Sequence, residues 1–456
     1  MGEVERFDLS FHAQDDSDSS KLNTAQWKTI LANHPEIEFV WLQFMLFEGT
    51  TRMRMIPAAY FTSMMQKNRN ISLSSAYLHA LRNDDIAPGA ASTGEMYLAP
   101  DISTASMNSN ESSRVRILAN MVNQDQTPRP ECIRSKLSNL SDILSHLHGF
   151  YLLIGYEIEV VFFRREDNEG AEPFVNHKCS AMTFEMRSLL PMIENIVRGF
   201  HEEQVPLEQY HSELAPGQWE FVLAPQQPLK AVDTLVRARE IISRSTGIVQ
   251  PYILDLFLII VAREPMSIFP STLLTHYRPP EAQFSDPFFA GIIDHLPSLM
   301  AFCLPLDASY GRLATGIWSG GEFVSWGWQN KETALRRITN NRFELKIHCG
   351  MANPYISLAA IMAAGLDGLR KSLPLVAGDC QVSPAELSEE QRSQLGIKPL
   401  PRDMQQSMKC LAQDNDLQRV LGEKYTATYL DVVREWNKQV DEMDETARRI
   451  TLLQNY

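Results

Sequence analysis

The sequence lacks an apolar segment long enough to cross a bilayer, and it has little positive charge. The longest apolar run, ILDLFLIIVA at 253–262, has 10 residues, whereas a membrane-spanning helix needs about 20. The 456 residues include 42 Lys and Arg against 56 Asp and Glu, which gives a formal net charge of -14. Nucleic acids and anionic membranes bind clustered Lys and Arg that neutralise their phosphates. We therefore expect neither nucleic acid nor a membrane as a partner.

Motifs for zinc binding, redox chemistry, secretion and hydrolysis are also missing. The six cysteines are far apart, without the CxxC or Cys/His spacing that is typical of zinc and redox sites. The N-terminus, MGEVERFDLSFHAQDDSDSS, is acidic and has no apolar core of a signal peptide. No nucleophile elbow or Ser/His/Asp grouping indicates a hydrolase. These absences predict a cytoplasmic protein with reduced thiols.

The residues that are present indicate a multidomain protein of the α+β class. With 44% apolar residues, the chain can bury the cores of two or three domains. The polar, Asp/Ser-rich residues 1–22 predict a flexible leader. Alternation over 37–57 predicts a β-hairpin, and helical periodicity then alternates with strand-like segments. We expect a small domain over 23–110 and a second domain over 111–456, joined by the surface segment MNSNESSRVR.

Two glutamates stand close together in the strand-like segment GYEIEVVFF. Side chains alternate along an extended segment, so Glu157 and Glu159 point to the same face. Two carboxylates held together raise each other's pKa unless a cation lies between them. This pair alone fits either a solvated strand edge or a cation site.

A second segment, HSELAPGQWEFVL, carries Glu213 and Glu220 on either side of a Pro-Gly turn. A strand, a tight turn and a second strand would bring both carboxylates to one end of a sheet, beside the first pair. Together the two segments resemble the GxExE and ExxPGQxE metal-binding strands of the glutamine synthetase superfamily, in the same order.

The resemblance covers most of residues 35–370. SYGRLATGIWSGGEFVSWGWQNKETALRR and FELKIHCGMANPYISLAAIMAAGLDGL look like the family's substrate, phosphate and ExR segments. FFAGIIDHLPSLMAF and WSGG resemble the glutamine synthetase-like domains of fungal developmental and secondary-metabolism proteins more than housekeeping glutamine synthetases. The resemblance implies an N-terminal β-grasp domain, followed by a catalytic domain with a curved antiparallel sheet and flanking helices.

The resemblance also implies two cations, Mg²⁺ or Mn²⁺, bound with ATP. The first cation would be held by Glu159, Glu213 and Glu220. The second would be held by Glu157, Glu344 and a histidine, but Leu274 stands at the histidine's position. His276 matches a histidine near the nucleotide phosphates, or it is an ordinary loop residue. Glycines that approach a bound glutamate are replaced by Phe269, Pro270 and Ser271, so we do not expect glutamate to be recognised.

The basic residues of the site are retained in part. By the resemblance, Arg336 and Arg342 clamp phosphates, and Arg312 holds the substrate carboxylate and acyl phosphate. Lys331 and Lys346 stand where many members carry arginine. Lysine keeps the charge but loses the bidentate fork, so it holds a planar carboxylate less rigidly. Outside these motifs, such residues would be read as solvated surface charges.

The ammonia site of the family is changed in this chain. Leu46 aligns with an aspartate that the family places in the neighbouring subunit's hairpin, and Trp318 aligns with the glutamate of a mobile flap. Neither side chain can take a proton from ammonium. A tryptophan occurs there in relatives that use larger amines, since its π face attracts cations and stacks on aromatic amines. Alternatively, Trp318 is a packing residue.

These residues predict a Mg-ATP-dependent ligase that joins a small-molecule acid to an organic amine rather than to ammonia, in secondary metabolism. In the family's reaction, a carboxylate receives the γ-phosphoryl group and an amine then displaces the phosphate. The alternative is a family member without ligase activity, which serves a different tailoring reaction or acts as a scaffold or regulator. The resemblance further implies a ring-forming homo-oligomer with active sites shared between subunits.

Overall fold

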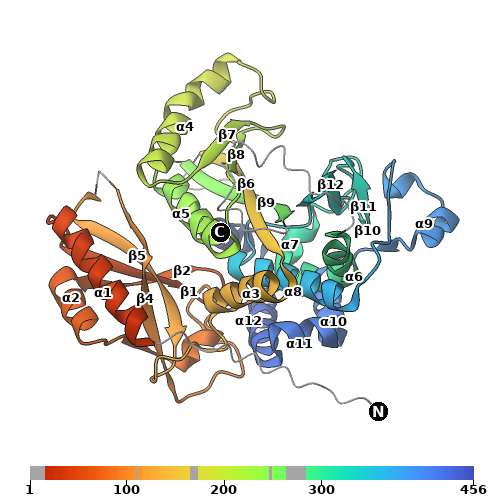
Figure 1. Ribbon diagram of the computed structural model, residues 1–456. Helices are drawn as coiled ribbons and strands as arrows, with labels where there is room; N and C mark the ends of the chain where they lie inside the picture. The colour runs from red at the N-terminus through yellow and green to blue at the C-terminus, as the bar shows by residue number, and fades with distance from the viewer. Residues whose placement is uncertain (1–15, 109–110, 165–172, 246–248, 263–283, 456) are drawn as a thin grey trace, which may run out of the picture. The chain divides into compact units, whose positions relative to one another are not determined.

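The computed structural model describes residues 16–108, 111–164, 173–245, 249–262 and 284–455 (Figure 1). Contacts divide the chain into two units. The N-terminal unit comprises Met1–Phe44, Arg52–Ser75 and Ser92–Cys132, and the C-terminal unit comprises Met45–Thr51, Ala76–Ala91 and Ile133–Tyr456. The α+β class predicted from the sequence is confirmed.

The N-terminal unit is a mixed five-stranded sheet in the order β2-β1-β5-β4-β3. Its elements are α1 (Asp16–Asn33), β1 (Phe39–Met45), β2 (Thr51–Pro57), α2 (Ala58–Gln66), β3 (Ile71–Ser74), β4 (Glu95–Met107) and β5 (Arg114–Val122). The predicted hairpin is confirmed as β1 and β2. Trp27 of α1 is fully buried and packs edge-to-face on Phe61 of α2, with ring centroids 4.9 Å apart. The two helices therefore share one core.

The unit boundary differs from the predicted division at residue 110. Strand β5 pairs in parallel with β1 and antiparallel with β4, so it belongs to the N-terminal sheet, and the division falls between Cys132 and Ile133. The segment MNSNESSRVR accordingly joins two strands of one sheet. Helix α1 begins inside the predicted leader, at Asp16, where Asp and Ser are favoured at a helix N-terminus.

The C-terminal unit is built on a curved, largely antiparallel sheet of seven strands in the order β11-β12-β13-β9-β6-β8-β7. The strands are β6 (Tyr151–Arg164), β7 (Leu207–Ser212), β8 (Gln218–Leu223), β9 (Val249–Ala262), β11 (Trp326–Trp328), β12 (Leu335–Thr339) and β13 (Arg342–Leu345). Strands β6 and β9 pair along their whole length and form the centre of the sheet. Two short strands, β10 (Phe323–Val324) and β14 (Lys398–Pro399), pair separately.

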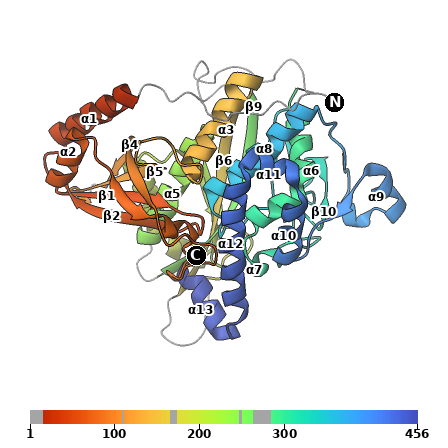
Figure 2. The same ribbon diagram turned by 90° about the horizontal axis from the view of Figure 1, so that it is seen from below.

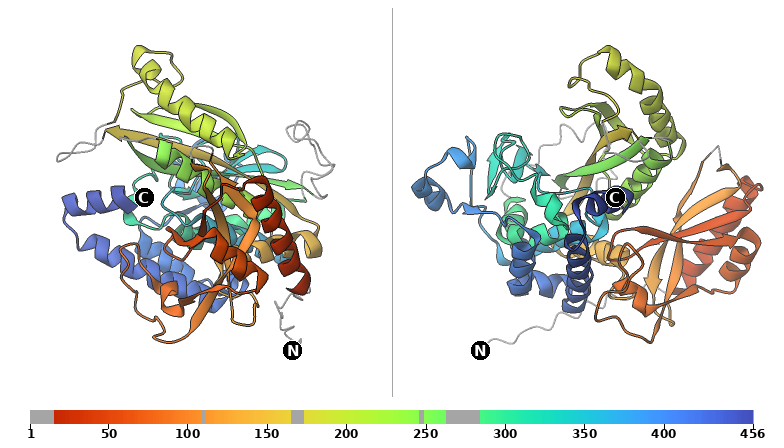
Figure 3. Two further views of the ribbon diagram at one scale, coloured as in Figure 1. Left: turned by 90° about the vertical axis from the view of Figure 1, so that its left-hand side faces the viewer. Right: turned by 180° about the vertical axis from the view of Figure 1, so that it is seen from behind.

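Helices flank this sheet (Figures 1 and 3). The helices of the unit are α3 (Ile133–His148), α4 (Phe184–Glu202), α5 (Pro228–Ser245), α6 (Asp286–Cys303), α7 (Asp307–Tyr310), α8 (Pro354–Lys371), α9 (Glu389–Leu395), α10 (Met404–Gln413), α11 (Asn415–Leu421), α12 (Glu423–Asp441) and α13 (Glu445–Asn455). Short 3₁₀ turns lie at Ser75–His79 and Pro384–Glu386.

Helix α8 is the core of the helical layer, because residues 354–368 are all buried. It packs closely on α6, and Figure 2 shows α6, α8, α10 and α11 together. A Cβ atom on Gly291 would lie 2.1 Å from the Ala364 carbonyl oxygen, and one on Gly368 would lie 2.1 Å from the Pro287 carbonyl oxygen. The two backbones can approach this closely only because both positions are glycine.

A buried histidine ties this helical layer together. His295 of α6 is 4% exposed, its Nε2 lies 3.0 Å from Asp367 Oδ2 of α8, and its Nδ1 lies 2.7 Å from Asp414 Oδ2 at the start of α11. Burial alone would lower the pKa of His295, but the hydrogen bonds and charges of the two aspartates outweigh it and raise the pKa to about 9. The Lys371 ammonium, 2.6 Å from both Asp367 and Asp416, supports the same cluster.

We expect His295→Gln to destabilise the protein, with the largest loss between pH 5 and 7. The pKa of His295 is about 9 in the folded protein and about 6.5 when unfolded, so its charge contributes roughly 3 kcal/mol below pH 6.5. That contribution disappears as the pH rises through 9. Urea unfolding at pH 6 and pH 9.5 measures the difference between wild type and variant. His34→Gln, at the half-exposed pair with Glu36, is the control and should change little; an equal loss for His295→Gln at both pH values would contradict the assignment.

Candidate active site

A row of polar side chains crosses three neighbouring strands of the C-terminal sheet. His211 of β7 faces Glu220 of β8, and Glu220 faces Glu159 of β6. Directly opposed residues on neighbouring strands point to the same side of a sheet. Glu157, two residues before Glu159, shares that side. The sheet therefore gathers three carboxylates and an imidazole on one face.

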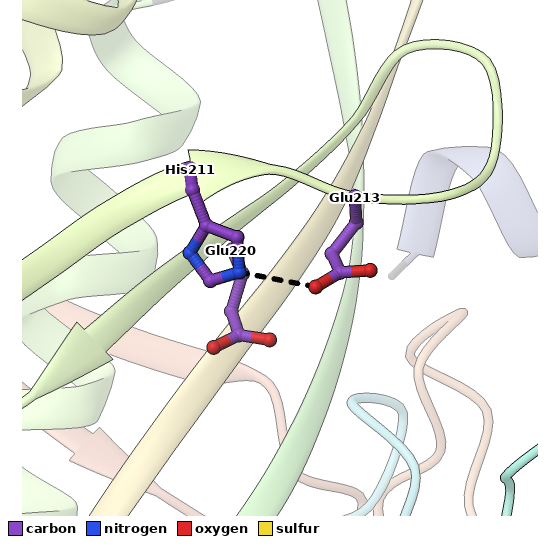
Figure 4. Close-up of side chains that lie close together, drawn as sticks. All are labelled: His211, Glu213 and Glu220. Atoms are coloured by element: carbon purple, nitrogen blue, oxygen red, sulfur yellow. Dashed lines mark hydrogen bonds and ion pairs between the residues drawn. The ribbon is translucent and has the colours of Figure 1, made fainter. Parts of the chain in front are cut away.

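A tight turn brings a fourth carboxylate to this face. After β7, Glu213 N donates to the Gln218 carbonyl and Gln218 N donates to the Ala215 carbonyl. Gly217 has φ +72°, and a Cβ there would lie 2.8 Å from the Phe162 carbonyl oxygen, so the turn requires glycine. Figure 4 shows the result, with Glu213 Oε1 3.1 Å from His211 Nε2. The predicted strand, turn and strand are present.

Gln218 connects this turn to the central strand. Its Nε2 donates to Glu159 Oε2 at 2.7 Å, while its Oε1 accepts from Ala215 N at 3.0 Å. One side chain thus holds the turn and orients a carboxylate of the cluster.

The other half of the site is basic. Glu344 of β13 lies opposite Arg336 of β12, and its Oε2 accepts from Arg336 Nη1 at 2.9 Å. Its Oε1 accepts from Lys346 Nζ at 2.8 Å. Burial would raise the pKa of Glu344, but Lys346 and Arg336 hold that pKa below its usual range. Arg342, two residues before Glu344, lies on the same side of β13.

Electrostatics link the acidic and basic halves. Burial is the largest cause that raises the pKa of Glu157 to about 7, and the charge of Glu344 adds to it. Burial also raises the pKa of Glu159, against the attraction of Arg312. Arg312 itself is held by its Nη1, which donates to the His348 carbonyl at 2.6 Å. The basic residues offset only part of the desolvation and repulsion of Glu157 and Glu159, because the pKa values of both stay raised.

The carboxylates of the row fit a hard divalent cation. Burial and then the charges of Glu157 and Glu159 raise the pKa of Glu220 to about 8. Ligand atoms of His211, Glu213 and Glu220 all lie within 4.8 Å of one another. Carboxylate oxygens are the preferred ligands of Mg²⁺ and Mn²⁺, and a cation at this point would offset the repulsion that helps to raise the pKa of Glu220.

Comparison with known proteins identifies the family of this chain. A family model described as "Glutamine synthetase, catalytic domain" matches residues 130–246 and 276–451. The chain belongs to the glutamine synthetase family. Protein fluG of Emericella nidulans is 35% identical over 442 residues, which cover 93% of this chain and 50% of that protein. The chain therefore spans about half the length of this relative.

Other relatives match over most of their length. Gamma-glutamylpolyamine synthetase GlnA3 of Streptomyces coelicolor is 26% identical over 82% of this chain and 84% of its own length. A solved structure described as "Apo GmaS without ligand" superposes with a TM-score of 0.75 at 20% identity and covers 93% of this chain and 98% of its own. At that identity the likeness shows a shared fold. Among the helices that the structure describes, none is long and apolar enough to cross a membrane.

The loop that carries Trp318 is the third part of the candidate site, after the carboxylates and the basic residues. Trp318 has φ +60° and is 55% exposed. Its backbone N–H donates to Glu332 Oε1 at 2.8 Å, and the Gly316 N–H donates to Glu332 Oε2 at 2.8 Å. Lys331 Nζ lies 5.0 Å from the centroid of the Trp318 ring. Lys331 is therefore placed on the tryptophan face.

The remaining predicted residues are placed as follows. His276 and Leu274, with Phe269, Pro270 and Ser271, lie outside the described residues. Leu46 is fully buried, and its carbonyl accepts from Asn353 Nδ2 at 2.7 Å. Leu46 belongs to the C-terminal unit by its contacts and its side chain is not exposed, whereas the resemblance implies a position that reaches a neighbouring subunit.

Sequence reasoning missed His211, Gln218 and Glu332. His211 precedes Glu213 by two residues, so strand alternation in HSE already favoured a shared face. Gln218 is part of the PGQ motif but was assigned no role. Nothing in the sequence indicated that Glu332 would hold the backbone of the Trp318 loop.

We expect Glu220→Gln to stabilise the metal-free protein at high pH. The pKa of Glu220 rises from 4.5 in the unfolded chain to about 8 in the folded protein. Ionisation of Glu220 therefore does not reduce the free energy of unfolding below pH 4.5, and it reduces this free energy progressively as the pH rises to 8. The amide removes a charge, so the variant should gain a few kcal/mol at pH 8.5 and little at pH 5. Urea unfolding in EDTA at both values measures this gain.

The same variant should lose the rise in Tm that Mg²⁺ or Mn²⁺ gives to the wild type, because a bound ligand stabilises the folded state. Glu208→Gln, at an exposed position of β7, is the matched control. A variant that is less stable than wild type at both pH values would exclude charge repulsion as the cause.

Proposed function

We propose that the chain is a Mg²⁺- and ATP-dependent ligase that joins a small-molecule carboxylic acid to an organic amine. The observation that carries this proposal is the set of buried and half-buried carboxylates on one sheet face, from which a divalent cation would remove the repulsion. Membership of the glutamine synthetase family supports the reaction type, since these enzymes use ATP and divalent metals in general.

In this proposal, Glu159, Glu213 and Glu220 hold the first cation, and Glu157 and Glu344 contribute to a second. Bound there, the cations would neutralise charge on the phosphoryl group that is transferred. Gln218 orients Glu159 through its 2.7 Å hydrogen bond. Glu213 and Glu220 already offer ligand atoms close together, whereas Glu344 would have to exchange a pairing with Arg336 or Lys346 for the second cation.

The basic residues bind and orient the anionic groups. Arg336 and Arg342, on neighbouring antiparallel strands, would bind the phosphates of ATP. Arg312 would hold the acid, because its charge acts on Glu159 while the His348 carbonyl fixes one end of its guanidinium. Lys346 adds a point charge, held at Glu344. His276 would approach the nucleotide, as in the family.

Trp318 would receive the amine. Its indole ring is largely exposed and already accepts the primary ammonium group of Lys331 on its face, which is the geometry of a cation–π contact. A relative named gamma-glutamylpolyamine synthetase makes an alkyl-ammonium substrate the leading candidate. An indole cannot deprotonate ammonium, so this position does not favour ammonia as the amine.

We further propose that the chain forms a ring-shaped homo-oligomer, is cytoplasmic and acts in secondary metabolism. Glutamine synthetases typically assemble into rings, and the relative in Emericella nidulans supports a fungal setting. Because Leu46 is buried, a residue other than Leu46 would have to complete any shared site.

A second candidate function is a role without ligase activity, as a tailoring enzyme of another kind, a scaffold or a regulator. The observation that favours it is the double pairing of Glu344 with Arg336 and Lys346. Both oxygens of a second-cation ligand are engaged, and Leu274 stands where the family has a histidine. Loss of a ligand weakens a hard-cation site.

We expect the purified chain to bind Mg-ATP at or below millimolar concentration, and to release phosphate only when a suitable acid and amine are both present. Arg312→Gln removes a charged hydrogen-bond donor, so kcat/KM should fall at least 10-fold while ATP affinity changes little. Calorimetry and a phosphate-release assay measure these quantities.

Arg434→Gln, at an exposed ion pair on α12, is the control and should behave as wild type. Absence of Mg-ATP binding would contradict the ligase. Binding without phosphate release across a panel of acids and amines would favour the second candidate.

Trp318→Ala should raise the KM for the amine about 3- to 30-fold, the range of one exposed to partly desolvated cation–π contact, and leave ATP affinity unchanged. Initial rates at varied amine concentration give this KM. Ile317→Ala, which truncates the exposed neighbouring side chain of the same loop, is the matched control. An unchanged KM in Trp318→Ala would make the tryptophan a packing residue.

A further inference from the structure

His211 is aimed at the carboxylate row by an irregularity in β7. Leu207 pairs with Leu223 of β8, but Gln209 pairs with Val222, so β7 carries one extra residue between these pairs. Without that extra residue, the register would place Tyr210, rather than His211, opposite Glu220. A β-bulge of this kind re-aims every following side chain and is common beside active sites.

Consecutive side chains of a strand point to opposite faces, and the bulge decides which face each of the two takes. Tyr210 stacks on Phe221, with ring centroids 6.4 Å apart and an interplanar angle of 19°. His211 lies on the other face, where its Nε2 is 3.1 Å from Glu213 Oε1 (Figure 4). The imidazole is therefore placed among the carboxylates by the backbone.

The spacing of these donor atoms is that of ligands around one ion. In an octahedral site with bonds of about 2.1 Å, neighbouring ligand atoms are about 3 Å apart and opposite ones about 4.2 Å. The His211–Glu213 separation of 3.1 Å matches neighbouring ligands, and the atoms of His211, Glu213 and Glu220 lie within 4.8 Å of one another. Glu159, directly opposite Glu220, lies on the same face beside this group and is the third carboxylate of the proposed site.

We propose that His211 is a ligand of the first cation, which gives this site one nitrogen and three carboxylate donors and a preference for Mn²⁺ over Mg²⁺. The inference rests on the first cation site of the proposed function. An imidazole nitrogen binds first-row transition metals better than Mg²⁺, whereas carboxylates suit both. The alternative is that His211 only donates a hydrogen bond to Glu213 and stays off the metal.

The test uses the full chain with metal alone, without ATP, acid or amine. Calorimetry with MnCl₂ and with MgCl₂ compares wild type and His211→Gln. We expect the variant to lose about 10-fold or more in Mn²⁺ affinity and less than 3-fold in Mg²⁺ affinity. His201→Gln, at the exposed end of α4, is the control for removing a histidine. Equal losses for both metals, or none, would overturn the proposal.

A second measurement needs no variant. Pulsed electron paramagnetic resonance of Mn²⁺ bound to the wild type should show coupling to one imidazole ¹⁴N nucleus, and His211→Gln should remove it. Manganese bound without such coupling would place His211 outside the metal sphere. Phosphate release without ¹⁴N coupling would support the ligase and reject His211 as a ligand. Coupling without phosphate release would support His211 as a ligand and contradict the ligase.

Discussion

The repulsion between carboxylates that are buried or half-buried on one face of the C-terminal sheet is the constraint on which the site depends. Glu159 and Glu220 are directly opposed on neighbouring strands, a position where like charges destabilise a sheet. Burial sharpens the conflict because it removes the water that would screen the charges. The neighbouring basic residues compensate these charges to different extents. Lys346 and Arg336 pair with Glu344, whereas the pKa of Glu220 stays raised to about 8.

Such a cluster persists only if the scaffold holds it rigidly. Strand β6 is paired along its whole length with β9 and also with β8, so the two glutamates cannot turn outward without breaking a ladder. Behind the sheet, the close contact of α6 and α8 and the charged bridge at His295 fix the helical layer. Rigid support of this kind is what allows a site to keep unfavourable charges close together.

The sequence predicted the parts of this site that depend on local periodicity. Alternation placed Glu157 and Glu159 on one face, and the Pro-Gly turn returned Glu213 and Glu220 to it. Other features depend on long-range pairing: β5 joins β1 in parallel, which moved the unit boundary to Cys132, and a one-residue bulge in β7 set the orientation of His211. A bulge leaves no clear mark in the sequence, since it is decided by packing on both faces at once.

The two halves of the site differ in the interaction that each offers to a ligand. In the metal-binding half, a neutral side chain in place of Glu220 would relieve repulsion, so the carboxylates work against stability in the metal-free chain. Groups that cost stability in this way are characteristic of functional sites. In the half that we propose to bind the amine, the exposed Trp318 offers a π face, on which the Lys331 ammonium lies. Under the proposed function, cation binding and amine choice could change independently, because the carboxylates stand on paired strands of the sheet, whereas Trp318 stands on a loop that Glu332 holds through two backbone hydrogen bonds.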